Sequence, residues 1–159
     1  MWYGYLTGLI FLIPYAILGI FTGNMIDGVG NRKNLFGLVS ILWSCTTLIQ
    51  ALYPNIYVFI GMRFLLAVFE SFGSPLMYSL LRDYFPPSRR VIVTSIVGCT
   101  INFGDAMSSL SLLLIKTFGW QFSYYVTSGY GIAIGVIAIV FLREPRRGQY
   151  ELINRAKLL

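Results

Sequence analysis

The sequence has no histidine, only two cysteines and few charged residues, and each shortage excludes a class of protein. Zinc sites built from histidine and closely spaced cysteines are excluded, because Cys45 and Cys99 lie far apart. Two cysteines are also too few for a small secreted module held together by disulfides. Charged residues make up 11% of the 159, against about 25% in soluble domains, while 57% are hydrophobic. A disordered chain has the opposite composition. We therefore interpret the sequence as that of an integral membrane protein.

Five segments are long and apolar enough to cross a bilayer as helices. A spanning helix needs about 20 mostly apolar residues to cross roughly 30 Å of hydrocarbon. Turn residues or charges separate the segments, as at Tyr53-Pro54-Asn55. We predict an all-α membrane protein with one membrane domain over residues 1–159. Its expected spans are residues 3–21, 35–52, 56–81, 91–115 and 122–142, followed by a basic tail over 143–159.

The basic residues are distributed unevenly between the two ends of these spans. Ten of the twelve lie in the first and third connections and in the tail: Arg32, Lys33, Arg82, Arg89, Arg90, Arg143, Arg146, Arg147, Arg155 and Lys157. This asymmetry predicts a multi-pass protein with these loops and the carboxy terminus on the cytoplasmic side. Because no charged anchor precedes the first span, we expect a further helix before Met1. The net charge of +6 is confined to turns that flank the membrane, so lipid is an expected partner and nucleic acid is not.

The connection after the first span carries a recognisable pattern, G-N-M-I-D-G-V-G-N-R-K over residues 23–33. It resembles the G-x-x-x-D-[RK]-x-G-[RK]-[RK] signature of the major facilitator superfamily, which joins helices two and three in that family. The resemblance implies that the loop latches two six-helix halves together on the cytoplasmic side. The residues that would form this latch motif are Gly23, Asp27, Gly30, Arg32 and Lys33. Gly28 and Asn31 replace basic residues of the signature, which implies a weakened latch.

Three further features resemble the spinster branch of that family, the lysolipid and sphingolipid transporters and their relatives. They are Trp43-Ser44 to Thr47-Leu48, Arg63 to Glu70, and Glu144-Pro145-Arg146-Arg147-Gly148. Ala67 stands where the family's R-x-x-x-G motif has glycine. The resemblance implies a partial major facilitator fold, helices two to six of the amino-terminal half. It also implies proton-coupled secondary transport of a small amphiphilic or anionic solute such as a lysolipid, without a cofactor. Because the second half is absent, we do not expect the isolated chain to transport.

Three ionisable residues lie inside the predicted spans: Arg63, Glu70 and Asp105. Such residues are costly in the bilayer centre and generally mark functional sites. Arg63 and Glu70 are two helical turns apart, so they share a face about 10.5 Å apart along the axis, and each is expected to pair with another helix. By resemblance, Arg63 is similar to the helix-four arginine that meets a helix-one acid, and Glu70 to the acid of the spinster helix-four motif. Together they would sense protons and hold an anionic head group. The alternatives are a static helix-locking arginine and a neutral, hydrogen-bonded acid.

Asp105 has two equally supported interpretations. It is a coupling acid or a partner for Arg63, or it is a neutral acid bonded to Ser108, Ser109 or a backbone carbonyl. Small residues on the spans, such as Gly131 and Gly135, are typical of helix contact faces.

Two other functions remain to be weighed against transport. A non-transporting membrane subunit, packed against other membrane chains, is favoured by the short length and the weakened motif. An intramembrane enzyme is disfavoured, because the chain has no histidine, no catalytic serine motif and no paired aspartates on adjacent helices.

Overall fold

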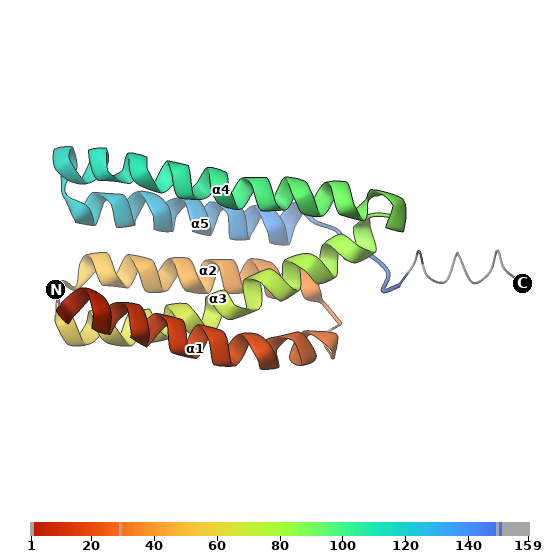
Figure 1. The fold of residues 1–159 in the computed structure, drawn as a ribbon, viewed down its shortest axis with the longest axis horizontal. Coiled ribbons are helices and arrows are strands. Elements are labelled where there is room, and N and C mark those ends of the chain that lie inside the picture. The colour runs from red at the N-terminus through yellow and green to blue at the C-terminus, as the bar shows by residue number, and fades with distance from the viewer. Residues whose placement is uncertain (1, 29, 149, 151–159) are drawn as a thin grey trace, which may run out of the picture.

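The computed structural model describes residues 2–28, 30–148 and 150, and every regular element in that part of the chain is an α-helix. The five helices are α1 (Trp2–Asp27), α2 (Arg32–Leu52), α3 (Ile56–Tyr84), α4 (Pro87–Phe118) and α5 (Trp120–Phe141) (Figure 1). All five are long and apolar enough to cross a membrane. The predicted all-α fold with five spans is therefore confirmed.

The helix boundaries differ from the predicted spans mainly near charged residues. The fourth helix begins at Pro87 rather than near residue 91, and its first turn contains Arg89 and Arg90. Proline favours the first helical position because its fixed φ suits a helix and its missing N–H is not needed there. The apolar stretch therefore begins only after these arginines, whereas the helix begins before them. At the other end of the chain, α5 stops at Phe141, one residue before the predicted limit.

Two short connections at one end of the bundle are built from residues that end helices. Between α2 and α3, the Asn55 side chain accepts a hydrogen bond from the backbone N–H of Tyr57 at 3.0 Å and caps α3. Between α4 and α5 stands Gly119, with a φ of +86°, a conformation that side-chain-bearing residues rarely adopt. Such tight turns keep consecutive helices antiparallel.

The main packing contacts are α2 with α5, α2 with α3, and α1 with α3. A Cβ added at Gly37 would lie 2.8 Å from the carbonyl oxygen of Gly135, and one added at Gly135 would lie 2.9 Å from that of Gly37. Glycine is therefore required where α2 meets α5. The expected helix contact face at Gly131 and Gly135 is confirmed, since both are buried against α2.

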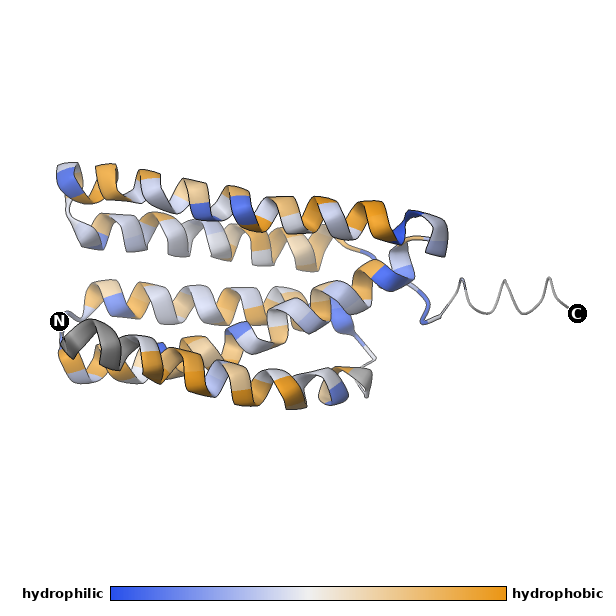
Figure 2. Cartoon of the chain, viewed as in Figure 1, coloured by the Kyte–Doolittle hydropathy of each residue, from blue (hydrophilic) through white to orange (hydrophobic). Residues whose placement is uncertain are grey.

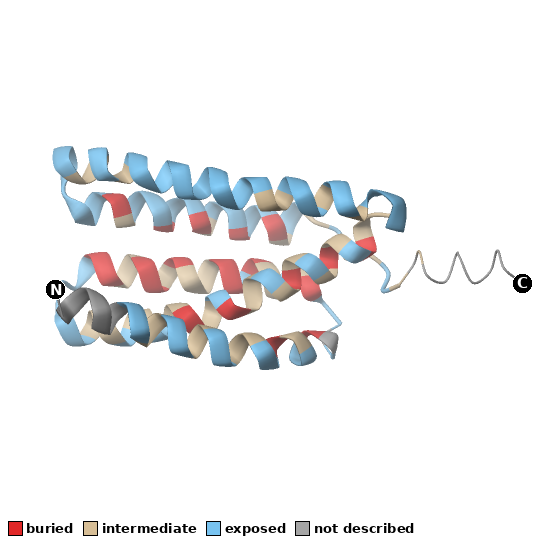
Figure 3. Cartoon of the chain, viewed as in Figure 1, coloured by how far each residue is buried: buried red, intermediate tan, exposed pale blue. Residues whose placement is uncertain are grey.

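The fourth helix differs from the other helices in its packing. Within the described chain, α4 has no buried residue, and it packs against α5 with few contacts to α3 (Figure 3). Its surface carries polar residues among large apolar ones, as Figure 2 shows. A polar side chain on α4 therefore does not by default point into the core.

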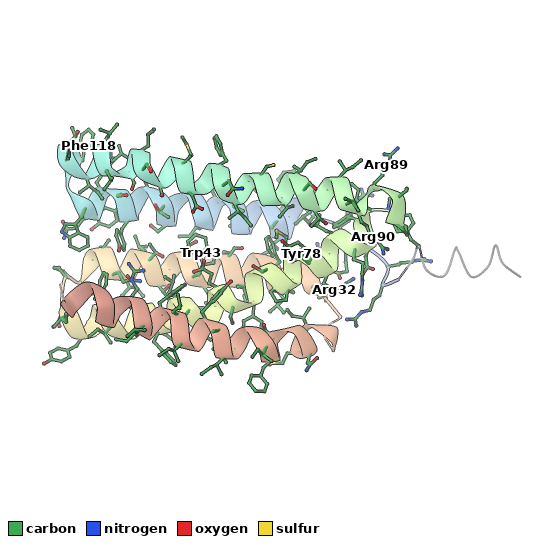
Figure 4. The ribbon with its side chains drawn as sticks, viewed as in Figure 1. Arg32, Trp43, Tyr78, Arg89, Arg90 and Phe118 are labelled. Atoms are coloured by element: carbon green, nitrogen blue, oxygen red, sulfur yellow. The ribbon has the colours of Figure 1, made fainter. Side chains whose placement is uncertain are left out.

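The basic clusters gather at one end of the bundle. Arg32, Arg89 and Arg90 lie at this end in Figure 4, whereas Phe118 lies at the opposite end and Trp43 between them. We call it the basic end. The predicted basic tail is described only as far as residue 148 and at Tyr150.

Candidate functional site

A cavity of about 390 Å³ lies between α2, α3 and α5, and we call it the polar cavity. Each of these helices contributes side chains from its middle or from its end opposite the basic end. The lining residues are Trp43, Thr47, Gln50, Arg63, Leu66, Glu70, Ser123, Tyr124 and Thr127. Arg63 and Glu70, placed on one helix face by their spacing, thus line the same cavity.

The guanidinium of Arg63 is held by aromatic side chains. Its Nη2 donates a hydrogen bond to the hydroxyl of Tyr124 on α5 at 3.0 Å, and its Cζ lies 5.1 Å from the centre of the Phe59 ring. Arg63 makes no ion pair with the described residues, and its buried Nε has no hydrogen-bond partner among them. The expected contact with another helix is present, but it is to a phenol. The positive charge of Arg63 is therefore not neutralised by a bonded carboxylate.

Glu70 lies two turns further along α3 and also lines the polar cavity. Its side chain is exposed, and it makes no hydrogen bond or ion pair with the described part of the chain. The expectation that Glu70 pairs with another helix is therefore not met. One guanidinium and one carboxyl group, neither bonded to an opposite charge, line the same space.

Asp105 does not join Arg63 and Glu70. It is exposed on α4 and is absent from the lining of the polar cavity. The expected pairing of Asp105 with Arg63 is wrong for the described chain, in which Tyr124 bonds Arg63. The alternative bond from Ser108 reaches the backbone carbonyl of Asp105, not its carboxyl group. The physical reason is that α4 packs on α5 and barely touches α3.

Tyr124 and Gln50 are among the cavity residues that were not predicted from the sequence. Tyr124 fits the aromatic girdle at a membrane interface, and nothing in the sequence indicates its bond to an arginine 61 positions earlier. Gln50 is buried, and its only sequence signal is a polar amide near the end of an apolar span. Both depend on helix packing, which a single sequence does not display.

A second cavity, of about 530 Å³, adjoins the polar cavity at Tyr124, and we call it the apolar cavity. It lies at the end of the bundle opposite the basic end. Its lining residues are Pro54, Asn55, Ile56, Phe59, Ile115, Trp120 and Tyr124. Phe59 links the two spaces as well, since it lines the apolar cavity and contacts the guanidinium of Arg63. A charged compartment and a hydrocarbon-like compartment therefore lie side by side.

The latch motif residues are used within the chain itself. Arg32 is 2% exposed, and its Nη1 lies 2.7 Å from Oδ2 of Asp83 at the end of α3. Its Nε lies 3.2 Å from Oε1 of Glu144, which follows α5, and Nη1 also donates to Ser79 at 2.8 Å. The backbone N–H of Lys33 donates to Glu144 at 2.8 Å. These contacts tie the start of α2 to the ends of α3 and α5, which we call the basic-end network.

The two glycines of the motif lie in open surroundings. A Cβ added to Gly23 or Gly30 would meet nothing within 4 Å. The side chain of Asp27 lies outside the described part of the structure.

Five long apolar helices, three of which line a cavity with charged residues, define a multi-pass membrane protein with a polar site between its helices, an architecture found in solute transporters. The family model of the Major Facilitator Superfamily matches residues 3–157. The chain belongs to the Major Facilitator Superfamily.

Relatives within the family support the spinster resemblance. The chain is 24% identical over 125 residues to the sphingosine-1-phosphate transporter SPNS2 of Danio rerio, covering 76% of this chain and 25% of that protein. It is 27% identical over 146 residues to protein spinster homolog 1 of Homo sapiens, covering 89% and 28%.

A solved structure supports the same resemblance. The crystal structure of a bacterial homolog to the human lysosomal transporter Spinster, inward-facing and unoccupied, matches with a TM-score of 0.74 and 26% identity. The match covers 92% of this chain and 36% of that one. The predicted resemblance is therefore confirmed, and the chain spans about a quarter to a third of the length of these proteins.

Proposed function

We propose that the chain is the part of a proton-coupled secondary transporter that binds the head group of an anionic amphiphile. The observation that carries this proposal is the state of Arg63, a guanidinium in a cavity between three helices with no carboxylate bonded to it in the described chain. Charged residues at membrane depth are generally paired or functional. An anion that entered the polar cavity would supply the missing partner.

The two adjoining cavities favour an amphiphile over a small polar anion. A head group at Arg63 would lie next to the apolar cavity, because Phe59 and Tyr124 contact the guanidinium and also line that cavity. Transfer of each methylene of a lipid chain from water into an apolar site is favourable by about 0.8 kcal/mol. SPNS2 of Danio rerio is named for a phosphate-bearing amphiphile, which fits this class of substrate.

Glu70 is the group proposed to couple proton binding to substrate binding. With Glu70 ionised, its charge and that of Arg63 sum to zero in the polar cavity. Protonation leaves the single positive charge of Arg63, which attracts an anion more strongly. Because coupling between two ligands is reciprocal, a bound anion would in turn favour protonation of Glu70.

We propose that the basic end faces the cytoplasm, since an excess of Lys and Arg in short loops sets this orientation. The latch motif would then act at the cytoplasmic ends of the helices. Its contribution in this chain is to brace α2, α3 and α5 through Arg32 and Lys33. A braced set of helices can move as one unit, as alternating access requires.

Binding in lipid nanodiscs tests the proposal without requiring transport by this chain. Lysophosphatidate is the probe, and the intrinsic fluorescence of Trp43 in the cavity lining is the readout. We expect saturable binding that Arg63→Gln weakens and that Arg89→Gln, an exposed arginine at the basic end, leaves unchanged. Because Trp120 lines the apolar cavity, the readout is taken in a Trp120→Phe background, in which Trp43→Phe should remove the fluorescence change. Equal binding by the Arg63→Gln and unmodified chains would contradict the proposal.

A further inference from the structure

Gln50 is buried in the wall of the polar cavity with an unused hydrogen-bond acceptor. The residue is 1% exposed and lies in the last turns of α2. Its Nε2 donates a hydrogen bond to the backbone carbonyl of Thr46 at 3.3 Å, so the nitrogen of the amide has a partner within α2. Its Oε1 is buried and has no hydrogen-bond partner among the described residues. A buried amide oxygen in a cavity wall is thus left open.

Two hydroxyl groups of the cavity lining already donate hydrogen bonds within their own helices. Thr47 donates to the carbonyl of Trp43 at 3.0 Å, and Thr127 donates to that of Ser123 at 2.9 Å. Buried polar groups are rarely left unpaired in proteins, and each such group calls for an explanation. A hydrogen-bond donor brought by a ligand would provide one.

The Nε of Arg63 is the complementary open group of the same cavity. It is a buried donor without a partner among the described residues, on a side chain that keeps its positive charge. Two residues of the cavity lining therefore each carry a buried group without a partner in the described chain, a cationic donor on Arg63 and a neutral acceptor on Gln50. A simple fatty acid or alkyl phosphate satisfies the first group and leaves the second unpaired.

We infer that Gln50 forms a subsite that selects anionic amphiphiles bearing a hydroxyl or ammonium group beside the anionic head. The inference rests on the proposed function and names the substrate class more closely. The anion would lie against Arg63, and the neighbouring donor would bond Oε1 of Gln50. A site built to bond a substrate hydroxyl or amine rejects the analogue that lacks it, because the buried acceptor then remains unpaired.

Three probes that share one acyl chain and one phosphate test the subsite: lysophosphatidate, its 2-amino analogue and its 2-deoxy analogue. Binding is measured in nanodiscs by tryptophan fluorescence and checked by equilibrium dialysis. For the unmodified chain we expect the 2-deoxy analogue to bind about tenfold more weakly than the probes that bear a donor, or about 1.4 kcal/mol. A preference for only one of those two would identify the donor as hydroxyl or ammonium.

Replacement of Gln50 assigns this selectivity to its side chain. In Gln50→Leu the tenfold preference should fall below about twofold, mainly because the hydroxyl and amino probes bind more weakly. Gln121→Leu, an exposed glutamine outside the cavity lining, is the matched control and should keep the preference. If Gln50→Leu does not fold, Gln50→Glu provides the test: it keeps an acceptor, adds a negative charge and should favour the 2-amino probe over the hydroxyl probe.

The possible failures are distinguishable. Equal binding of all three probes by the unmodified chain, with Arg63→Gln weakening each of them, overturns the subsite and leaves the proposed function standing. The same holds if Gln50→Leu retains the tenfold preference or Gln50→Glu shows no preference for the amine. Absence of binding by every probe contradicts the proposed function itself.

Discussion

Two groups of charges in this protein have similar chemistry and opposite states. At the basic end, Arg32 and Asp83 are 2% and 1% exposed and lie 2.7 Å apart, with Glu144 completing the network. In the polar cavity, Arg63 and Glu70 likewise place a guanidinium and a carboxyl group two turns apart on one helix, yet neither is bonded to an opposite charge in the described chain. In our proposal, the bonded charges brace the helices, whereas the unbonded ones bind a ligand.

The largest effect is expected from breaking the basic-end network. Arg32→Met would remove the nearest cation from the buried carboxylate of Asp83. That carboxylate keeps the longer contact with Arg82 at 3.9 Å and the hydrogen bond from the N–H of Gly148. Breaking a buried ion pair typically costs about 3–5 kcal/mol. The free energy of unfolding in mixed micelles measures this loss. Adding Asp83→Leu to Arg32→Met should recover much of the lost unfolding free energy, because two apolar side chains then replace the buried ion pair. The surface control Arg89→Met should stay within about 0.5 kcal/mol.

Replacing the arginine of the polar cavity is expected to affect ligand binding more than stability. Arg63→Gln should weaken lysophosphatidate binding by about 10- to 100-fold, since hydrogen bonds to charged groups contribute about 1.5–3 kcal/mol. Its unfolding free energy should change far less than that of Arg32→Met, because no described carboxylate loses a partner. Isothermal titration and micelle unfolding measure the two quantities. A large loss of stability with intact binding would reverse the comparison.

Glu70 sharpens the comparison through pH. Lowering the pH protonates Glu70 and raises the net charge of the cavity pair from zero to +1, so the affinity for an anion should rise. At an effective dielectric constant of about 20 and a separation of about 10 Å, the effect is about tenfold. Glu70→Gln should bind with the higher affinity at every pH. The ratio of the two affinities, measured from pH 5 to pH 9, cancels ionisation of the probe. A constant ratio would remove Glu70 from the coupling.

The smallest effect is expected at Asp105. This residue is exposed on α4 and does not line the polar cavity. Asp105→Asn in this chain should leave lysophosphatidate affinity unchanged within about twofold and stability within about 0.5 kcal/mol. Titration in the same nanodiscs provides the test. A tenfold loss of affinity would show that Asp105 acts at the cavity after all.

The sequence predicts the properties of single helices and the small-residue contact face of α5, but it misses the side-chain bonds between helices. Apolar length predicts five spans, and the helical period predicts that Arg63 and Glu70 share a face. The bond from Arg63 to Tyr124 depends on how α3 packs against α5, which no local pattern encodes. The predicted pairing of Asp105 with Arg63 is wrong for the same reason, because the packing of α4 on α5 determines where Asp105 lies relative to the cavity.

The basic-end network shows a related limit. The motif at residues 23–33 and the Glu144-Pro145-Arg146-Arg147-Gly148 stretch are both visible in the sequence. Their contact through Arg32 and Glu144 spans 112 positions and appears only when the ends of α2, α3 and α5 meet. Family resemblance suggests that both segments matter, while the structure shows that they bond each other.

The central claim is that Arg63 holds the anionic group of the substrate, and a distance measurement tests it directly. Solid-state NMR on chain labelled with ¹⁵N-arginine, in nanodiscs saturated with lysophosphatidate, detects dipolar coupling between the guanidinium nitrogens and the phosphorus. We expect coupling in the unmodified chain, its retention in Arg89→Lys and its loss in Arg63→Lys. Undiminished coupling in Arg63→Lys would place the phosphate at another arginine and contradict the account.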